Sequence, residues 1–549
     1  MIEAEDGFHI AHVSQTGQKL AHTRYRFLIS GEIVDPLPND GEHLLYAPEP
    51  QSVYRLSIPA LRAHAAQHVS ADPDPQLKRA NRVAHLEGDA VDWIADGNGA
   101  VRVAAAVHGG SSPSVRLWYR DDPDGDWRSL YQFSVDSLFE LPLWPVSFAP
   151  DDRNFYVMSN RDRDTTALFE FDVEGAALGP VIFARDNADL DGVMLDYSGK
   201  RVLAAYYTEG GVRRYHHLEA FNARYQRSLE HAFPDESVAI LNASRDDRYL
   251  VAFTTSPQNP GAYYLLNTEK NEAEPLGRVL PELGPEDLME VKHVVVTTDD
   301  GVRLEGFLTL PKTQEKPPLV VMPHGGPIGV RDERAFDASS QYLAAQGFAV
   351  LQVNYRGSWG YGKAFLAAGM KQWGLGIEDD VDAVLDRVLQ LDLVDADRMC
   401  IAGASYGGYS ALMTAVRHPE RFRCAASLAG VTDIPLMFNR SDLSTDDFWK
   451  RTFVNIAGDP EREFERMLER SPAYRAAEIQ VPVFVAHGTW DRRVDIDHAF
   501  RLMAMLDLYR KPYEWMMIEE GRHSFTIEQA RSYYRMLANF LWKHLQEPF

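Results

Sequence analysis

The segment Gly403-Ala404-Ser405-Tyr406-Gly407 places a serine in a tight turn between two elements of regular structure. An apolar strand is expected over 399–402, and a helix over 410–416 that ends before Pro419. Glycines two residues before and after the serine are typical of a nucleophile elbow, in which a side chain at either position would strike neighbouring backbone. The following helix N-terminus favours negative charge beside the hydroxyl. The motif is short enough to occur by chance, so the remainder of the chain decides its meaning.

Composition limits the classes of protein that this chain can belong to. With 549 residues, it exceeds one compact domain, so two or more are expected. Hydrophobic residues make up 45% and charged residues 25%, as in an ordinary globular protein. The 80 acidic residues against 56 basic ones give a formal net charge of −24, which disfavours nucleic acid and anionic membrane as partners.

The chain carries neither an apolar run long enough to span a bilayer nor the basic-then-apolar order of a signal peptide at residues 1–6. We therefore expect a cytoplasmic protein, or a periplasmic or secreted one only if a leader was removed. Cys400 and Cys424 lie in apolar strand-like runs, where we expect buried free thiols. His216 and His217 are adjacent and so face different ways, and we expect no metal and no cofactor.

The first half reads as short strands separated by polar turns. The segments 148–157, 196–204 and 243–251 each consist of a turn, a basic residue and an apolar strand, and Arg153, Arg201 and Arg248 lie 48 and 47 residues apart. A fainter copy lies at 15–21. This period is typical of a β-propeller, which we prefer to a sandwich with recurrent hairpins. Residues 1–285 are predicted to form six or seven blades, with a short helix near 61–66 as the only helical run.

After the linker 281–287, strands alternate with helices. A hairpin is expected over 294–308, and strands over 319–322, 349–353, 483–486 and 515–518. A helix end is expected at 342–347. In another helix, Ile377, Val381, Val384, Leu385 and Val388 recur at helical spacing, with Asp and Glu on the opposite face. Residues 286–549 are therefore predicted to form an α/β domain with a doubly wound, mostly parallel sheet.

A serine nucleophile needs a base and an orienting carboxylate, which on such a sheet follow strand ends in the order Ser, Asp, His. Asp491 follows the strand that leads to His487-Gly488; its neighbours Asp495 and Asp497 fit the start of the next helix better. His523 lies in the loop after the last strand and before the closing helix. His544 inside that helix and His418 at the end of the serine's helix are poorer candidates.

The loop His324-Gly325-Gly326-Pro327 follows an upstream strand and supplies the third part of the site. In this arrangement the oxyanion is held by the N–H after the nucleophile, here that of Tyr406, and by an N–H from such a loop, which we assign to Gly326. Glycines there let the backbone point into the site.

These motifs resemble the catalytic domain of the prolyl oligopeptidase family of serine peptidases over residues ~290–549. The matching segments are 324–327, 354–358 with 360–362, 403–409, 487–494 and His523. The resemblance implies an α/β-hydrolase domain preceded by a β-propeller that keeps folded proteins from the active site. Gly-Ala-Ser-Tyr-Gly-Gly together with His-Gly-Gly-Pro resembles the acylaminoacyl-peptidase-like branch. Prolyl oligopeptidase itself usually has Asn after the serine, and the dipeptidyl branch usually has Trp before it.

The chain departs from the family in places. The family commonly reads Gly-His-Gly-Phe at the histidine, whereas Arg522 here stands between Gly521 and His523. The first half is short for the family, and the glutamate pair of the dipeptidyl branch is not located. His324 and Tyr361 are assigned to substrate binding, and Arg356 either to a substrate carbonyl or carboxylate or to loop carbonyls. Trp449 and Phe448 fit buried core better than an apolar pocket.

We therefore expect a serine peptidase that cleaves oligopeptides through an acyl-enzyme, with Ser405, Asp491 and His523 as the catalytic residues. The resemblance implies release of an N-terminal residue or acyl-amino acid. An esterase of the same fold and a dipeptidyl- or oligopeptidase of the same family are the alternatives, and a non-catalytic propeller scaffold is a third. Assembly into a homo-oligomer and the residue preferred at the cleavage site stay open.

Overall fold

The protein was analysed as a computed structural model. It describes residues 2–546 except 5–6, 17–18, 28–30, 38, 68–75, 109–113, 135–140, 142, 197–199, 245, 314 and 446. Contacts divide the chain into two compact units. One comprises 1–185, 190–206 and 216–223; the other comprises 186–189, 207–215 and 224–549.

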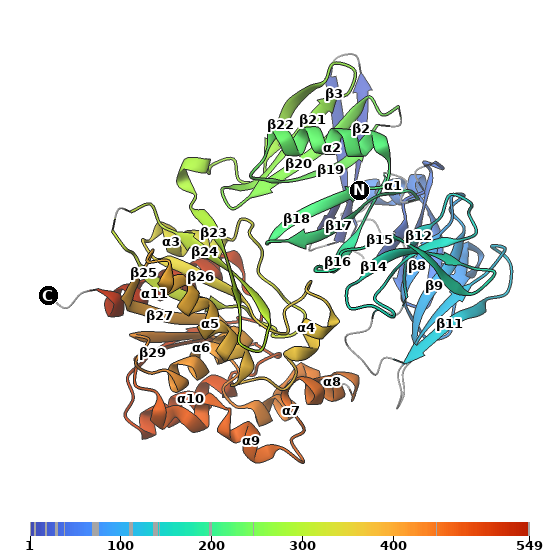
Figure 1. Ribbon diagram of the computed structural model, residues 1–549. Helices are drawn as coiled ribbons and strands as arrows, with labels where there is room; N and C mark the ends of the chain where they lie inside the picture. Colours follow the sequence, from blue (N-terminus) through green and yellow to red (C-terminus); the bar gives the residue numbers. More distant parts are fainter. Residues whose placement is uncertain are drawn as a thin grey trace. The chain divides into compact units, whose positions relative to one another are not determined.

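The N-terminal part is a β-propeller built from small antiparallel sheets (Figure 1). The sheet β1–β3 comes first, and a sheet of three or four strands forms each of the blades that follow. Each strand pairs with the next along the chain. The bounds of the first two sheets are β1 (Ile2–Ala4), β2 (Gly7–Thr16), β3 (Lys19–Phe27), β4 (Glu32–Asp35), β5 (His43–Glu49), β6 (Ser52–Ser57) and β7 (Arg82–His85).

The later blades follow in chain order. The sheet β4–β7 is the first blade. The second blade consists of β8 (Asp89–Ala95), β9 (Val101–His108), β10 (Ser114–Tyr119) and β11 (Arg128–Ser134). The third blade consists of β12 (Trp144–Phe148), β13 (Phe155–Ser159), β14 (Ala167–Asp172) and β15 (Ala177–Phe183). The last two consist of β16 (Leu190–Leu195), β17 (Val202–Glu209) and β18 (Val212–His217), and of β19 (Ser237–Ala243), β20 (Tyr249–Ser256), β21 (Asn259–Asn267) and β22 (Glu272–Arg278).

The repeated sequence motif marks one position in the blade. Its three clear copies lie between β12 and β13, between β16 and β17, and between β19 and β20, which is the turn from a blade's first strand to its second. Residues 197–199 and 245 of these copies, and 17–18 of the faint copy, lie outside the described residues. The motif therefore recurs because the same turn recurs, and the propeller interpretation is confirmed.

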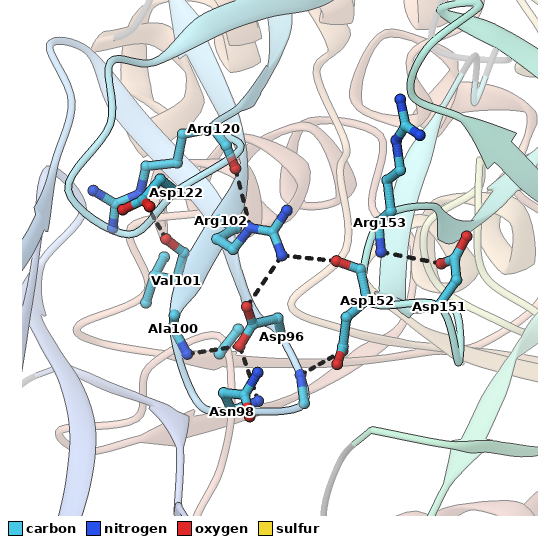
Figure 2. Close-up of polar contacts among 12 residues, drawn as sticks. Asp96, Asn98, Ala100, Val101, Arg102, Arg120, Asp122, Asp151, Asp152 and Arg153 are labelled. Carbon is cyan, nitrogen blue, oxygen red and sulfur yellow. Dashed lines mark hydrogen bonds and ion pairs between the residues drawn. The ribbon is translucent and has the colours of Figure 1, made fainter.

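Polar side chains join neighbouring blades. Arg102 on β9 donates from Nη1 to the Asp152 carbonyl in the β12–β13 turn at 2.7 Å and to Asp96 at 3.2 Å (Figure 2). Its Nε donates to the Arg120 carbonyl at 3.1 Å. Arg102 is about nine-tenths buried, so its donors have to be satisfied by protein groups, and this arrangement satisfies them.

Within the described residues, five blades lie between Glu32 and Arg278, fewer than the six or seven predicted. The prediction divided the whole region by the 47- to 48-residue period, so it counted residues that do not belong to these five blades. Those residues form the sheet β1–β3 and the helices α1 (Ile58–Gln67) and α2 (Ala220–Ala232). Helix α2 was missed: Tyr225 and Leu229, four residues apart, pack on the β19–β22 sheet. The domain boundary predicted at residue 285, in the 3₁₀ turn η3 (Pro285–Asp287), stays a prediction.

An eight-stranded sheet follows, in the order β23-β24-β26-β25-β27-β28-β29-β30. The pairs β23–β24 and β24–β26 are antiparallel, and the remaining pairs are parallel, as predicted. The bounds are β23 (Glu290–Thr297), β24 (Arg303–Leu310), β25 (Pro318–Pro323), β26 (Ala349–Asn354), β27 (Asp395–Ala404), β28 (Cys424–Leu428), β29 (Val483–Gly488) and β30 (Tyr513–Ile518).

Helices cover both faces of this sheet and form two cores (Figure 1). Val321 and Ile401 point into the core under α5 (Gly376–Gln390), α6 (Tyr406–Arg417) and α10 (Asp497–Leu508). Their neighbours Val320 and Ala402 point into the core under α3 (Ala338–Ala345) and α11 (Ile527–Leu545). This alternation is the two-residue period of a strand buried on both faces. The shorter helices are α4 (Lys363–Ala368), α7 (Met437–Arg440), α8 (Asp447–Ala457) and α9 (Phe464–Glu469).

The two cysteines form a disulfide, which corrects the expectation of free thiols. Cys400 on β27 and Cys424 on β28 are direct partners across the two parallel strands, with 4.8 Å between their Cα atoms. Both are fully buried on the α3–α11 side of the sheet. In the part of the chain that the structure describes, no helix has the length and apolar character needed to cross a membrane.

Candidate active site

Ser405 connects β27 to α6 in a strained turn. Its φ of 56° and ψ of −122° lie where a non-glycine residue is rarely found, and such strain gathers at functional sites. A Cβ at Gly403 would lie 2.3 Å from the Gly407 carbonyl oxygen, and one at Gly407 would lie 2.1 Å from that of Pro323. Both positions therefore require glycine, as the sequence pattern predicted.

The structure brings Ser405, His523 and Asp491 together from three different strand ends. The distance from Ser405 Oγ to His523 Nε2 is 3.1 Å, and that from His523 Nδ1 to an Asp491 carboxylate oxygen is 2.8 Å. Both lie within hydrogen-bonding range, and they join the side chains in the order hydroxyl, imidazole, carboxylate. His523 therefore contacts Ser405 through one ring nitrogen and Asp491 through the other, which is the arrangement that the serine mechanism requires.

Asp491 is held by its own loop. Its second carboxylate oxygen accepts the backbone N–H groups of Arg493 at 2.9 Å and Val494 at 3.0 Å, and its side chain is fully buried. Asp497 instead opens α10, and Asp495 accepts its N–H at 2.9 Å. The two alternative aspartates thus serve the helix start, where acidic groups are favourable.

The two oxyanion-hole candidates lie beside the serine. Tyr406 is the first residue of α6, and Gly326 has a φ of 122°, open to glycine but not to other residues. Both line a cavity of about 410 Å³ together with Ser405 and His523. Ser405 and the two residues proposed as donors therefore line the same cavity.

His324 supports its loop. Its ring stacks on Tyr355 with centroids 4.2 Å apart, Nε2 lies 2.9 Å from Ser358 Oγ, and Nδ1 lies 2.7 Å from the Gly325 carbonyl oxygen. Desolvation lowers the pKa of His324 to about 4, so the ring is neutral near pH 7. It is not among the described residues that line the serine's cavity, and these contacts favour a positioning role for it over the substrate contact assigned from sequence.

Arg356 lies against acidic side chains away from the serine's cavity. Nε and Nη2 donate to the two carboxylate oxygens of Asp380 at 2.8 and 2.7 Å, and Nη1 donates to Asp300 at 3.1 Å. The contacts favour the structural alternative over a substrate contact. Tyr361 donates to Glu305 at 3.1 Å and accepts from Asn354 at 2.8 Å, and burial raises its pKa. Neither lines the described wall of the cavity.

The cavity beside Ser405 is walled by apolar side chains. Trp449 lines it and is 47% exposed, so the expectation that it belongs to the buried core was wrong; the side chain of Phe448 lies outside the described residues. Thr452 and Arg493 are the polar side chains added to the catalytic ones. The apolar lining consists of Ile328, Trp373, Val431, Met437, Leu443, Trp449, Phe453, Ile456 and Val494.

Glu378 is a residue of the site region that the sequence reasoning missed. It was assigned to the polar face of α5, but both it and Asp380 are fully buried. The Tyr406 hydroxyl donates to Glu378 at 2.9 Å, and burial raises the pKa of Glu378 to about 7. The available signal was its spacing: Glu378, Val381 and Leu385 lie at i, i+3 and i+7, which places Glu378 on the apolar face of the helix.

Comparisons with known proteins agree with this geometry. Residues 334–548 match the model of the prolyl oligopeptidase family. Dipeptidyl aminopeptidase BIII of Pseudoxanthomonas mexicana is 25% identical over 82% of this chain and 66% of its own length. The acylamino-acid-releasing enzyme of Rattus norvegicus is 29% identical over 43% of this chain and 32% of its own. The chain thus spans less than two thirds of the length of these curated relatives.

A solved structure of a puromycin-hydrolysing peptidase from Mycobacterium tuberculosis superimposes with a TM-score of 0.72 at 20% identity, covering 100% of this chain and 88% of that one. It supports the fold, a propeller followed by an α/β-hydrolase domain. Residues 334–548, which include Ser405, Asp491 and His523, are thus similar to the prolyl oligopeptidase family. This similarity is to hydrolases of the serine peptidase type.

Proposed function

We propose that the protein hydrolyses short peptides through an acyl-enzyme formed on Ser405. The observation that carries this proposal is the hydrogen-bonded series Ser405, His523 and Asp491 at a strained strand-to-helix turn. His523 Nε2 takes the hydroxyl proton as Ser405 Oγ attacks the scissile carbonyl carbon. Asp491 keeps the ring oriented and stabilises the imidazolium.

The N–H groups of Tyr406 and Gly326 hold the negative oxygen of the tetrahedral intermediate. His523 then gives its proton to the leaving amine, the C–N bond breaks, and the acyl group stays on Ser405. Water, deprotonated by the same imidazole, releases it. A loss of one such oxyanion donor costs about 10²–10³ in rate.

The apolar cavity supports a preference for a bulky apolar residue on the acyl side of the cleaved bond. A methylene group in such a pocket changes kcat/KM by roughly 10–200-fold. We therefore expect Trp449→Ala to reduce the preference for Phe over Ala at that residue by about tenfold, measured with acetyl-aminoacyl 4-nitroanilides. Phe464→Ala, which removes a ring 46% exposed on α9 outside this cavity, is the control and should leave the preference unchanged.

By similarity to the acylamino-acid-releasing enzyme, the products proposed are an acylated or free N-terminal residue. Oligopeptides are the proposed substrates, since propeller-bearing members of the family exclude folded proteins. An acetylated hexapeptide should be cut while folded lysozyme is not, measured by mass spectrometry. Equal cleavage of both would contradict this restriction.

An esterase with the same catalytic residues is the second candidate, because the serine mechanism serves both bonds. Turnover of 4-nitrophenyl esters without any turnover of acyl-aminoacyl anilides would reject the peptidase proposal. Fluorophosphonate should label Ser405, as shown by peptide mapping, and Ser405→Ala should lower kcat on the order of 10⁶. A folded wild-type protein that takes no label would support the scaffold alternative.

A cytoplasmic location is the remaining part of the proposal, and the disulfide provides its test. Reducing compartments keep most protein thiols reduced. Cys400 and Cys424 should therefore be found reduced when cells are quenched in acid and alkylated after unfolding. Complete oxidation in the cell would point instead to an oxidising compartment.

A further inference from the structure

A second hollow, of about 1020 Å³, adjoins the catalytic residues on the side of the acid and base loops. It is lined by His523 and Asp491 and also by Trp490, Arg492, Arg493 and Arg522. Among the described residues, its lining shares Arg493 and His523 with the cavity beside Ser405, and it includes neither Ser405 nor the apolar residues of that cavity. We call this hollow the arginine pocket.

Two of its arginines have no side-chain partner among the residues that the structure describes. Arg493 pairs with Asp442 at 2.7 Å. Arg492 and Arg522 are exposed, and within the described structure neither guanidinium makes an ion pair, a side-chain hydrogen bond or a ring contact. An arginine head offers five donors in a fixed fork suited to a carboxylate, and these two guanidinium groups line the same opening.

The acidic groups of the pocket are engaged by groups other than Arg492 and Arg522. Asp442 is taken by Arg493, and Asp491 by His523 and two backbone N–H groups. Asp495 is the one further carboxylate in the lining, and it accepts the Asp497 N–H. The described lining thus holds three arginines and three aspartates, and Arg492 and Arg522 are the two arginines in it whose guanidinium groups pair with none of these carboxylates.

Arg492 and Arg522 are sequence neighbours of two proposed catalytic residues. Arg492 directly follows Asp491, the proposed orienting acid, and Arg522 directly precedes His523, the proposed base. Trp490, 53% exposed, adds an apolar surface beside them. A substrate bonded at Ser405 extends away from the serine on either side of the cleaved bond, and a chain that passes His523 enters the arginine pocket.

We propose that Arg492 and Arg522 bind a carboxylate of the peptide substrate close to the cleaved bond, which makes acidic or short peptides the preferred class. The inference rests on the proposed peptidase function. The carboxylate has two sources: the C-terminus or an acidic residue on the leaving side, or an acidic group on the acyl side. Both share the recognition chemistry and are separated by the experiment.

The test measures binding to Ser405→Ala protein, which does not depend on turnover. Acetyl-Ala-Phe-Ala with a free C-terminus is compared with its amide, and succinyl-Ala-Phe-Ala-amide with the acetyl form, by calorimetry at low salt. Exposed charge pairs contribute modestly, so the carboxylate peptide of one pair should bind about three- to tenfold more tightly. The preference should shrink in 0.5 M salt. The pair that shows it identifies the source.

Arg492→Gln combined with Arg522→Gln should abolish the preference and leave the affinity for the neutral peptides unchanged. Arg522→Glu should reverse it. Arg535→Gln, on the exposed face of α11 and outside the pocket, is the matched control and should keep it. Equal affinities within both pairs, or a preference that survives the double substitution, would overturn the inference.

The same peptides given to the active protein separate this inference from the function it rests on. If carboxylate peptides bind more tightly to Ser405→Ala protein through Arg492 and Arg522 while wild type hydrolyses no amide, the peptidase proposal fails and the anion site stands. If hydrolysis proceeds with equal kcat/KM on charged and neutral peptides, the anion site fails alone.

Discussion

The buried carboxyl group of Glu378 accepts a hydrogen bond of 2.9 Å from the phenol of Tyr406, the residue directly after the nucleophile. Tyr406 also stands at the edge of Trp373, with ring centroids 4.6 Å apart. The first residue of α6 is thereby held in place by Glu378 on α5 and by Trp373. Glu378 thus contacts the side chain of Tyr406, the residue whose backbone N–H is proposed to hold the oxyanion.

Stability should depend on pH through Glu378. Burial raises its pKa from 4.5 to about 7, so the folded protein takes up a proton that the unfolded chain has released between these values. Its stabilising contribution is complete below pH 4.5 and is lost as pH rises through about 7, a change of roughly 3 kcal/mol. Glu378→Gln removes the titration and keeps an acceptor for Tyr406.

The free energy of unfolding of Glu378→Gln relative to wild type should therefore rise from pH 5 to pH 8. Urea unfolding followed by tryptophan fluorescence measures it. A difference that stays flat over this range would show that Glu378 is ionised throughout.

Gly407→Ala should disrupt the elbow. The added Cβ would lie 2.1 Å from the Pro323 carbonyl oxygen, which belongs to β25 and cannot turn aside as a side chain would. We expect a loss of about 1–3 kcal/mol or more and no fluorophosphonate labelling of Ser405. At Gly277 a Cβ meets no atom within 4 Å, so Gly277→Ala is the control. Normal labelling of Gly407→Ala would contradict the tight turn.

Asp491→Asn should lower kcat by about 10⁴ because the amide favours the wrong imidazole tautomer while the shape is kept. Asp497→Asn, at the first residue of α10, changes charge by the same amount outside this series. Steady-state kinetics on an acyl-aminoacyl anilide compare the two. If the Asp497 variant loses activity and the Asp491 variant does not, the acid has been assigned to the wrong residue.

Arg356→Met should destabilise the protein with little effect on KM. Asp380 is fully buried and bonded to Arg356 through two side-chain donors and the Arg356 N–H, so removing the guanidinium leaves an unpaired charge. Breaking a buried pair costs about 3–5 kcal/mol. Lys543→Met breaks an exposed pair with Glu514 and should cost less than about 1 kcal/mol. A large rise in KM with unchanged melting temperature would restore the substrate-binding alternative.

The sequence predicted what short segments determine by themselves. The strand, turn and helix around Ser405 follow from local glycine spacing, and the propeller from a turn repeated along the chain. The order of the strands in the sheet was not readable in the same way. It places Cys400 opposite Cys424 and turns Arg356 toward Asp380, and the sequence around these residues has no pattern that predicts either contact. Glu378 looked like a solvent-facing residue because its burial comes from α6 packing over α5.

The disulfide also provides a natural reporter. Cys400 and Cys424 lie in the middle of the sheet and under α11, so a reductant reaches them only when that covering layer opens. The rate at which a folded sample consumes a phosphine reductant, followed by thiol alkylation, therefore measures how often the final helix lifts from the sheet that carries the nucleophile.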